Sequence, residues 1–331
     1  MTVVINGDTG ITQAGEFNSD STMGFKNRII NGAMVIDQRN AGAAVTGSGE
    51  FPVDRFLVGN TTDGAFSAQQ DSSAPAGFTN SVKITATTAD ATLTTTQLLS
   101  FQHRIEGTNV ADLGWGTANA KTVTLSFWVR SSLTGTFGGA LRNSANNRSY
   151  PFTYSISVAD TWEQKSVTIE GDTSGTWLTT TGLGIRVFFG LGAGPDASGT
   201  AGAWNSNNNS SVTGAVSVIG TLNATWYVTG VQLEVGSTAT SFDYRPYGTE
   251  LMLCQRYYQN GFTRCRATAA SGSLEWTYSY AVVKRAAPTV TVTSSGSGTV
   301  TVANSANTDA VAFNETANSS GNVVFTVSAE L

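Results

Sequence analysis

The chain has 331 residues and a formal net charge of −5, and only 12% of its residues are charged. Its 18 basic residues form no run, so the composition indicates neither a nucleic-acid surface nor a surface for anionic membranes. No apolar run reaches the roughly 18 residues that a membrane span needs, and we expect no secretory signal, because no basic segment precedes an apolar one near residue 1.

The residue composition favours an all-β protein with a sizeable core. Hydrophobic residues make up 40% of the chain, Gly is frequent at 36, and Ser, Thr and Asn crowd the segments between apolar runs. The length predicts two or three domains. With one histidine, His103, and two cysteines, Cys254 and Cys265, we expect no transition-metal site and no cofactor. A disulfide between the two cysteines stays open.

In chain order, residues 1–25 come first and predict an extended arm. The segment "VVINGDTGIT" alternates only briefly and carries turn signals at 6–7 and 9–10. It is too short to bury a face of its own. We therefore expect the arm to attach to a partner or a larger assembly.

The stretch "NRIINGAMVIDQRNAG" (27–42) follows. Asn31-Gly32 is a turn signal, and 27–39 is predicted to be the first strand of a sandwich. We expect Arg28, Asp37 and Arg39 to form ion pairs at its rim rather than a site, because half-buried charges persist when paired. The candidate partners elsewhere in the chain are Arg130, Glu234 and Glu106.

Alternating strands recur from residue 82 to 236 and predict the two sheets of a jelly roll over 26–259. In 121–132 and 184–192, apolar residues at every second position are expected to face the core. In 224–236 the same reasoning places Tyr227 with Val231 and Leu233 on one face. Trp226 and Val228 then fall on the opposite face.

A helix is predicted over 249–259, with Thr249 as its cap, and a second β unit over 260–331. The second unit contains about five short strands with few bulky side chains. Because such a small unit is marginal on its own, we expect oligomerisation to supply the missing burial.

Loop tryptophans suggest a sugar site. Trp177 and Trp204 lie in Gly-, Thr- and Asn-rich loops, and Asn207 and Asn208 follow Trp204. An aromatic face beside amide donors is the chemistry that binds a pyranose. The alternative, in which these tryptophans cover an edge of the sandwich, stays open. Trp128, Trp226 and His103 are expected to be structural.

No catalytic motif is present, so we do not expect an enzyme. Asp160 with Glu163, or Glu170 with Asp172, could supply the two carboxyls of a glycosidase, which stand about 5–9.5 Å apart. Solvated turns are the favoured interpretation of both pairs. No long internal repeat typical of a depolymerase tailspike is found.

Six phrases carry a resemblance to a known family: "NRIINGAMVIDQRNAG", "DRFLVG", "KTVTLSFWVRSSLTGTFGGALRNSANNRSYPFTYSI", "ADTWEQKSVTI", "GVQLEVGSTATSFDYRPYGTELMLCQRYYQ" and "VVFTVSAEL". Together they resemble bacteriophage tail-fibre and receptor-binding proteins, from residue 27 onward. The resemblance implies a virion protein with a jelly roll similar to carbohydrate-binding modules, commonly a homotrimer with its C-terminal part toward the host. Residues 260–331 match only in character, so no receptor specificity is implied.

The expected function is therefore a non-enzymatic tail fibre or receptor-binding protein of a virion, assembled in the host cytoplasm. Its expected partners are its own copies, other virion proteins through residues 1–25, and host surface polysaccharide. A capsid decoration, cement or baseplate protein without a receptor is the alternative.

Overall fold

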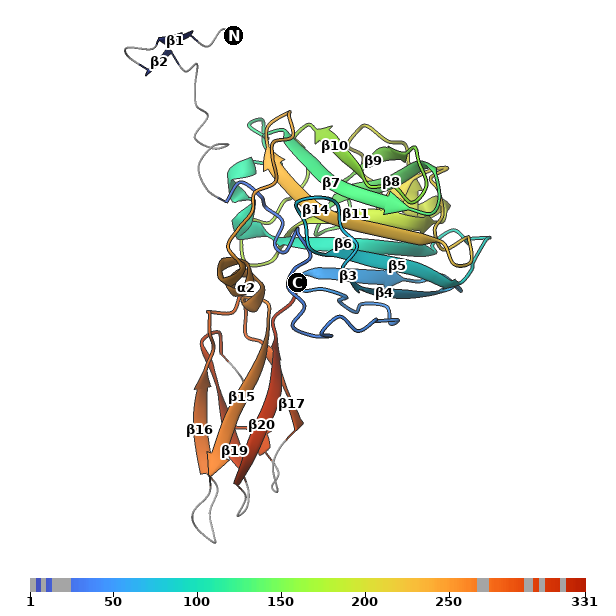
Figure 1. The fold of residues 1–331 in the computed structure, drawn as a ribbon. Helices are drawn as coiled ribbons and strands as arrows, with labels where there is room; N and C mark the ends of the chain where they lie inside the picture. The colour runs from blue at the N-terminus through green and yellow to red at the C-terminus, as the bar shows by residue number, and fades with distance from the viewer. Residues whose placement is uncertain are drawn as a thin grey trace.

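The computed structural model describes residues 4–6, 10–13, 25–266, 274–294, 300–303, 307–315 and 320–331. It confirms an all-β fold built from a large and a small sandwich (Figure 1). In the arm it describes the paired strands β1 (Val4–Asn6) and β2 (Gly10–Gln13). The remainder of the predicted arm up to residue 24 lies outside the described residues.

The large sandwich has two five-stranded antiparallel sheets. The first has the order β10 (Glu163–Ile169), β7 (Val123–Ser131), β14 (Thr225–Val235), β5 (Ser81–Thr88) and β4 (Ala65–Asp71). The second has the order β3 (Phe56–Asn60), β6 (Leu98–Glu106), β11 (Leu183–Ala193), β8 (Gly135–Asn143) and β9 (Ser149–Ile156). Three short 3-10 helices, η1 (Gly107–Asn109), η2 (Ala111–Leu113) and η3 (Pro195–Ala197), lie between the strands. The two-residue strand β12 (Ser198–Gly199) pairs in parallel with β13 (Ser211–Val212).

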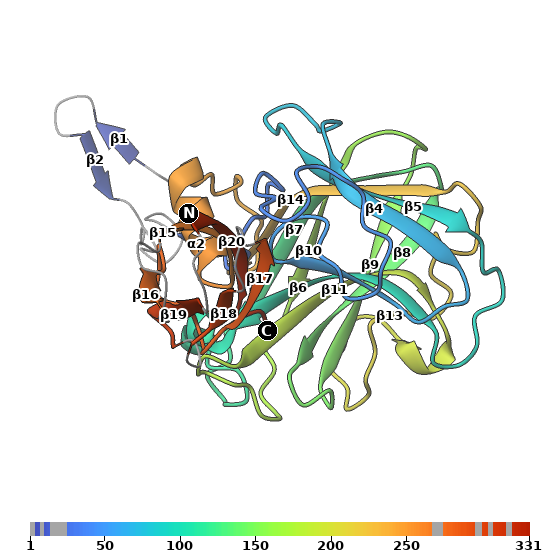
Figure 2. The same ribbon diagram turned by 90° about the horizontal axis from the view of Figure 1, so that it is seen from below.

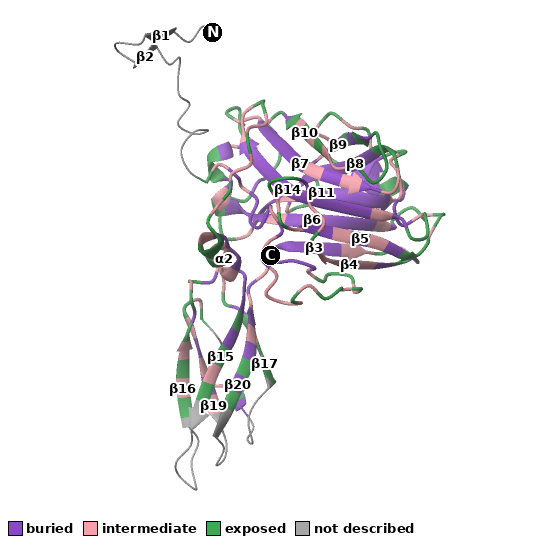
Figure 3. Ribbon diagram, viewed as in Figure 1, coloured by how far each residue is buried: buried purple, intermediate pink, exposed green. Residues whose placement is uncertain are grey.

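The core lies between these two sheets, where buried residues fill the strands (Figure 3). The predicted alternation is confirmed in two strands. On β7, Val123, Leu125, Phe127 and Val129 are fully buried, and on β11 so are Val187, Phe189 and Leu191. Trp226 is also fully buried, as expected for a structural tryptophan, whereas Trp128 is half-buried.

The predicted faces of β14 are wrong for its first half. Trp226 and Val228 lie in the core together with Val231 and Leu233. The pairing of β14 with β7 shifts register between Thr229 and Gln232, and Gly230 within that bulge has φ 62°. One extra residue reverses the alternation from there onward.

The prediction of a first strand over 27–39 is also wrong, although the turn at Asn31-Gly32 is present. Asn31 O accepts from Met34 N at 2.9 Å, and the Asn31 amide donates to the main-chain oxygens of Ile36 and Asp54 at 2.8 and 2.9 Å. The Asn31 side chain thus satisfies part of this backbone, and only isolated main-chain bonds to β14, from Arg28 N to Leu233 O and from Val231 N to Gly32 O, take the place of a continuous strand ladder.

The predicted helix is shorter than expected. Helix α2 covers Tyr247–Gln255, with Pro246 rather than Thr249 at the cap position, and β15 (Tyr258–Arg266) begins where the helix was expected to continue. Cys254 on α2 is a free, buried thiol. Nothing is described for the side chain of Cys265.

The small sandwich has two three-stranded sheets. Their orders are β15, β20 (Ser320–Ser328), β17 (Thr289–Ser294), and β16 (Leu274–Ser279), β19 (Ala310–Glu315), β18 (Val300–Val302). Its core is formed around Val311, Phe313, Val323, Phe325 and Val327. Strand β15 was not predicted, because the helix expected over 249–259 overlaps its first two residues.

Candidate functional site

The loop tryptophans lie together at one edge of the large sandwich. Trp115 packs edge-on against Trp177 and Trp204 at 4.8 and 5.3 Å between ring centroids, and Tyr150 packs against Trp204 at 5.3 Å. Each indole N–H has a partner. Trp115 Nε1 donates to Lys121 O at 2.8 Å, and Trp204 Nε1 donates to Glu170 O at 2.7 Å.

Trp177 is only 9% exposed, and its Nε1 lies 3.3 Å from Asp172 Oδ2. Its ring is therefore committed to this aromatic cluster and does not offer an open face for a sugar. The arrangement matches the open alternative, in which these tryptophans cover an edge of the sandwich.

Asn207 and Asn208 do not join the indoles in a site. The main chain of Asn207 accepts from Ser149 Oγ at 2.8 Å, which fixes the loop between β12 and β13 to the start of β9. Asn208 is exposed and makes no hydrogen bond to the other described residues. Asn208 lines the same cavity as Arg142 of β8.

The loop between η3 and β13 lies against the outer face of the second sheet (Figure 2). Gly138 and Gly190 permit this contact: a Cβ at either position would lie within 2.6 Å of Ser211 Oγ. The absence of side chains at these two positions thus brings Ser210 and Asn208 over the sheet.

A cavity of about 150 Å³ forms where this loop meets the sheet. Its polar lining comes from Thr96, Arg142, Asp196, Asn208 and Ser210. Three of these residues, Thr96, Asp196 and Asn208, are exposed, so the cavity is open to solvent.

Arg142 is the fixed member of this cavity, and it is 5% exposed. Its Nη1 donates to Ser210 Oγ at 2.6 Å, and Nη2 donates to Asn146 Oδ1 at 2.6 Å. The guanidinium lies over the Phe188 ring, 4.7 Å from the centroid. Burial lowers the pKa of Arg142 to about 10, and the nearby charge of Arg186 adds to the effect, so Arg142 remains protonated at neutral pH.

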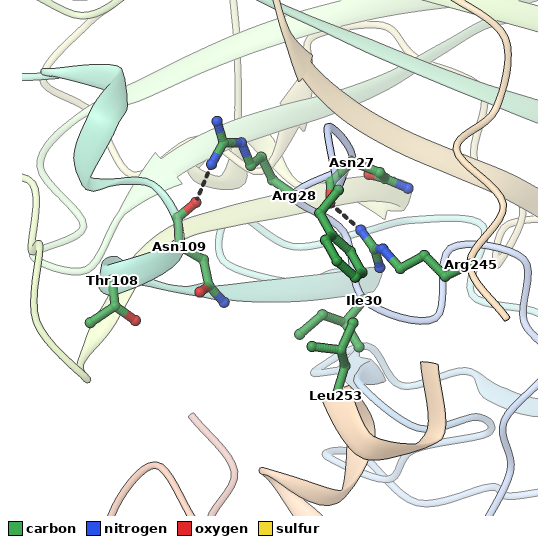
Figure 4. Close-up of a pocket in the computed structure, with 8 residues that line it drawn as sticks. Asn27, Arg28, Ile30, Thr108, Asn109, Arg245 and Leu253 are labelled. Carbon is green, nitrogen blue, oxygen red and sulfur yellow. Dashed lines mark hydrogen bonds between the residues drawn. The ribbon is translucent and has the colours of Figure 1, made fainter. Parts of the chain in front are cut away.

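A second cavity lies where the 27–39 segment meets η1 and α2 (Figure 4), and its two arginines are both bound to other parts of the protein. Arg28 points toward Asn109, whose main-chain oxygen accepts from Arg28 Nη1 at 3.1 Å, and Arg28 Nη2 bonds Asp112 at 2.6 Å. Arg245 donates to Asn27 O and pairs with Glu250 at 3.1 Å. Both guanidinium groups are occupied in joining the 27–39 segment to η1 and α2.

The expected polar network is not one network. Asp37 accepts main-chain N–H groups of Arg39, Asn40 and Gly42 at 2.7–3.2 Å and forms no ion pair among the described residues. Arg39 pairs with Asp54 at 3.0 Å and with Glu330 at 2.8 Å.

The suggested partners of the motif lie elsewhere. Arg130 pairs with Asp160 at 3.4 Å, and Glu234 accepts from Thr240 Oγ1 at 2.6 Å and from Gln232 Nε2 at 2.9 Å. Sequence spacing alone could not place the Arg130 and Glu234 side chains, because their partners Asp160 and Thr240 lie in loops whose path the sequence does not predict.

Glu106 is fully buried and serves the junction with α2. Arg256 Nη2 and Tyr257 Oη each donate to its carboxylate at 2.7 Å. Burial alone would raise the pKa of the Glu106 carboxyl, but these hydrogen bonds outweigh burial and hold it below its usual value.

The carboxylates considered as a catalytic pair also have structural partners. Asp172 is buried and receives two bonds from Arg148, at 2.7 and 2.6 Å, so the interpretation of this residue as a solvated turn was wrong. Glu163 accepts from the main-chain N–H groups of Ser157 and Val158 and pairs with Lys165 at 2.6 Å. His103 is fully buried and hydrogen-bonded to the main chain of Ile30, as expected for a structural histidine.

Sequence reasoning missed Arg142, Thr96, Asp196 and Ser210 as members of one cavity. The available signal was Arg142 itself, a charge at an outward position of the alternating segment "TFGGALRN". Among the described residues, no group of three or more His, Cys, Asp or Glu side chains could hold a metal ion. The described helices also include none with the length and apolar character of a membrane span.

No protein-family model matches this sequence, and no curated protein matches it. Among solved structures, the chain is similar to the enzymatically active domain of tailspike protein 4 of bacteriophage CBA120, with 12% identity and a TM-score of 0.34 over 64% of this chain and 22% of that one. It is also similar to a putative sugar binding protein of Bacteroides thetaiotaomicron, with 12% identity and a TM-score of 0.37 over 63% of this chain and 100% of that one.

A third similar structure is the family 11 carbohydrate-binding module of Clostridium thermocellum in complex with a mixed-linked tetrasaccharide. It has 12% identity and a TM-score of 0.30, over 61% of this chain and 100% of that one. The chain spans about a fifth of the tailspike structure. At these identities and TM-scores the similarities establish neither a family nor a function.

Proposed function

We propose that this chain is a non-enzymatic recognition protein of a phage particle, a tail fibre or receptor-binding protein that contacts host surface glycans. The six phrases that resemble such proteins support the phage assignment. The observation that carries the binding role is the open cavity at the outer face of the second sheet, which brings an amide, hydroxyls and a fixed guanidinium together.

The chemistry of this cavity suits a polysaccharide. Sugar hydroxyls both donate and accept hydrogen bonds, and the lining offers both roles through Asn208, Thr96 and Asp196. Because these three side chains are exposed, a polysaccharide that is longer than the cavity can still contact them.

A second function is favoured by the aromatic cluster. Trp115 and Trp177 are buried, Trp204 is half-buried, and the three rings pack edge-on against one another, so little of the predicted stacking platform faces solvent. A decoration or baseplate protein without a receptor would need the sandwich but no open aromatic face.

Binding of the full-length protein to host cells and to their purified surface polysaccharide tests the proposal. We expect saturable binding that falls at least about fivefold in Asn208→Ala combined with Thr96→Ala. The matched control is Asn119→Ala, an exposed loop residue outside the cavity. If the wild-type protein binds neither cells nor polysaccharide, the receptor role is wrong and the structural function is retained.

Two further parts of the proposal concern assembly and catalysis. We expect a homotrimer in sedimentation, attached to the particle through residues 1–25, and no new reducing ends when the protein is incubated with the polysaccharide. Turnover that Glu163→Gln abolishes would contradict the non-enzymatic assignment.

A further inference from the structure

Three arginines stand in register across the second sheet. Arg186 of β11 is directly opposite Arg104 of β6 on one side and Arg142 of β8 on the other. Directly opposed residues of neighbouring strands project from the same face, and strands lie about 4.8 Å apart, so the three Cα positions span about 10 Å. We call Arg104, Arg186 and Arg142 the arginine row.

Like charges directly opposite each other destabilise a sheet, so such a row needs compensation. Inside the protein, Arg142 and Arg186 find only neutral acceptors. Both donate to Asn146 Oδ1, at 2.6 and 3.1 Å, and Arg142 also donates to Ser210 Oγ. Within the described ranges, neither lies within 4 Å of a carboxylate oxygen.

Arg104 ends the row near the small sandwich, where it donates to the main-chain oxygen of Leu331. The Nη2 groups of Arg104 and Arg186 make no hydrogen bond to the described part of the chain, and both side chains are half-exposed. The row therefore retains donor capacity on a face that solvent reaches.

We propose that the arginine row binds an oxoanion group of a glycan, that is, a carboxylate, sulfate or phosphate on the polysaccharide that the adjoining cavity receives. The inference rests on the proposed glycan-binding function and adds the class of sugar. The planar fork of a guanidinium donates two parallel hydrogen bonds to such a group, and three forks in register suit repeated or multidentate anions.

The surroundings favour an anionic sugar over nucleic acid. The whole chain has a net charge of −5 and its basic residues form no run, so the sequence does not provide the extended basic surface that a nucleic-acid backbone needs, whereas one oxoanion group needs only a local cluster. Asp196 lies at the cavity end of the row beside Arg142. Its carboxylate repels an anion and accepts from hydroxyls, which directs the anionic group toward Arg186 and the sugar ring toward Asn208.

Calorimetric titration of the full-length protein tests this with four probes: a sulfated oligosaccharide, an oligogalacturonate, a neutral dextran oligosaccharide and inorganic sulfate. We expect at least one charged oligosaccharide to bind more tightly than dextran. We also expect its affinity to fall as NaCl is raised from 50 to 300 mM, and to fall about tenfold or more in Arg186→Gln. Binding of inorganic sulfate with no preference for charged sugars would overturn the glycan assignment.

Arg130→Gln is the matched control, because Arg130 is a half-exposed arginine on the outer face of the other sheet and has its own partner in Asp160. Thermal unfolding verifies that each variant is folded, and Arg186→Lys, which keeps the charge but loses the fork, should bind with intermediate affinity. Charged-sugar binding that is unchanged in both Arg186 variants would overturn the inference.

The two proposals fail in different ways. If host polysaccharide binds but the binding is insensitive to salt and to Arg186→Gln, the arginine row is not the site and the glycan-binding function remains. If no polysaccharide binds to the wild-type protein, the proposed function itself is wrong.

Discussion

Single buried charges in this protein are each held by particular partners. Asp172 receives both bonds of the Arg148 fork, Glu106 is bonded by Arg256 and Tyr257, and Arg55 is clamped by Glu330 with its guanidinium 3.5 Å from the centroid of the Tyr257 ring. A charge removed from water is tolerated only when its hydrogen bonds are replaced. The positions of these pairs explain why a chain with few charges buries several of them.

Lys284 is a buried base that should make the stability of the protein depend on pH. It is 2% exposed, and its Nζ donates to Gln255 O and, at 2.9 Å, to Gln259 Oε1. Burial lowers the pKa of Lys284 from 10.5 to about 8. Between these values the unfolded chain holds a proton that the folded protein has released, so stability rises with pH there.

We therefore expect the free energy of unfolding of the wild type, relative to Lys284→Met, to be constant below about pH 8. It should increase by up to about 3 kcal/mol between pH 8 and 10.5, and then level off. Denaturant unfolding at a series of pH values measures this difference, and the comparison removes other titrating groups. A difference that stays flat from pH 7 to 10.5 would show that folding does not lower the pKa of Lys284.

At the scale of elements, the sequence predicted the strands in which buried and exposed residues alternate without interruption. It did not predict the faces of a strand in which a β-bulge reverses that alternation. The alternation in 121–132 and 184–192 identified β7 and β11 and their core faces. The bulge at Gly230 reversed the faces of β14, because glycine in a strand indicates a bulge without saying where pairing slips.

The candidate cavity shows the same limit. Asn208 was singled out from composition, but its neighbours Arg142 and Thr96 come from segments more than 60 residues away. The two small residues that admit the covering loop, Gly138 and Gly190, look like ordinary turn or strand glycines in the sequence. Only the sheet register brings Arg104, Arg186 and Arg142 into one row.

Gly32 joins the 27–39 segment to β14, and its replacement tests that contact. Gly32 O accepts from Val231 N at 2.9 Å, and a Cβ at position 32 would stand 2.1 Å from Val231 O. We expect Gly32→Ala to lower the free energy of unfolding by about 1–3 kcal/mol, because the backbone must shift to relieve the clash.

Gly248→Ala is the control, since a Cβ there meets nothing within 4 Å and the position is helical. Alanine is the better helix former, so this variant should be as stable as the wild type or slightly more so. Equal stability of the Gly32 and Gly248 variants in denaturant unfolding would mean that the segment can move away from β14 at no cost.

At the scale of the whole molecule, the last residues of the chain join the small sandwich to the large one. Ala329 N donates to Tyr257 O at 2.7 Å, and Arg285 donates to the main-chain oxygens of Ala329 and Glu330 at 2.6 Å and of Thr181 at 3.0 Å. Residues 329–331 thus lie among groups from α2's end, the β10–β11 loop and the smaller unit. A junction of directed polar bonds fixes orientation more strictly than an apolar contact of the same size would.

Glu330 is the charged centre of this junction, and Glu330→Ala tests whether the two sandwiches unfold together. Arg39 and Arg55 both pair with the Glu330 carboxylate, and Arg55 is 1% exposed. Removing the carboxylate leaves the Arg55 charge buried beside Arg104, which costs about 3–5 kcal/mol, the range for breaking a buried pair. We expect calorimetry to show one cooperative transition in the wild type and two in the variant, with β20 the first to lose protection from hydrogen exchange.

Glu275→Ala, at an exposed position of β16, is the control and should retain the single transition. Two transitions in the wild type itself would mean that the polar junction orients the two sandwiches without coupling their stability. The free-energy cost of leaving Arg55 unpaired would then lower the stability of the large sandwich alone.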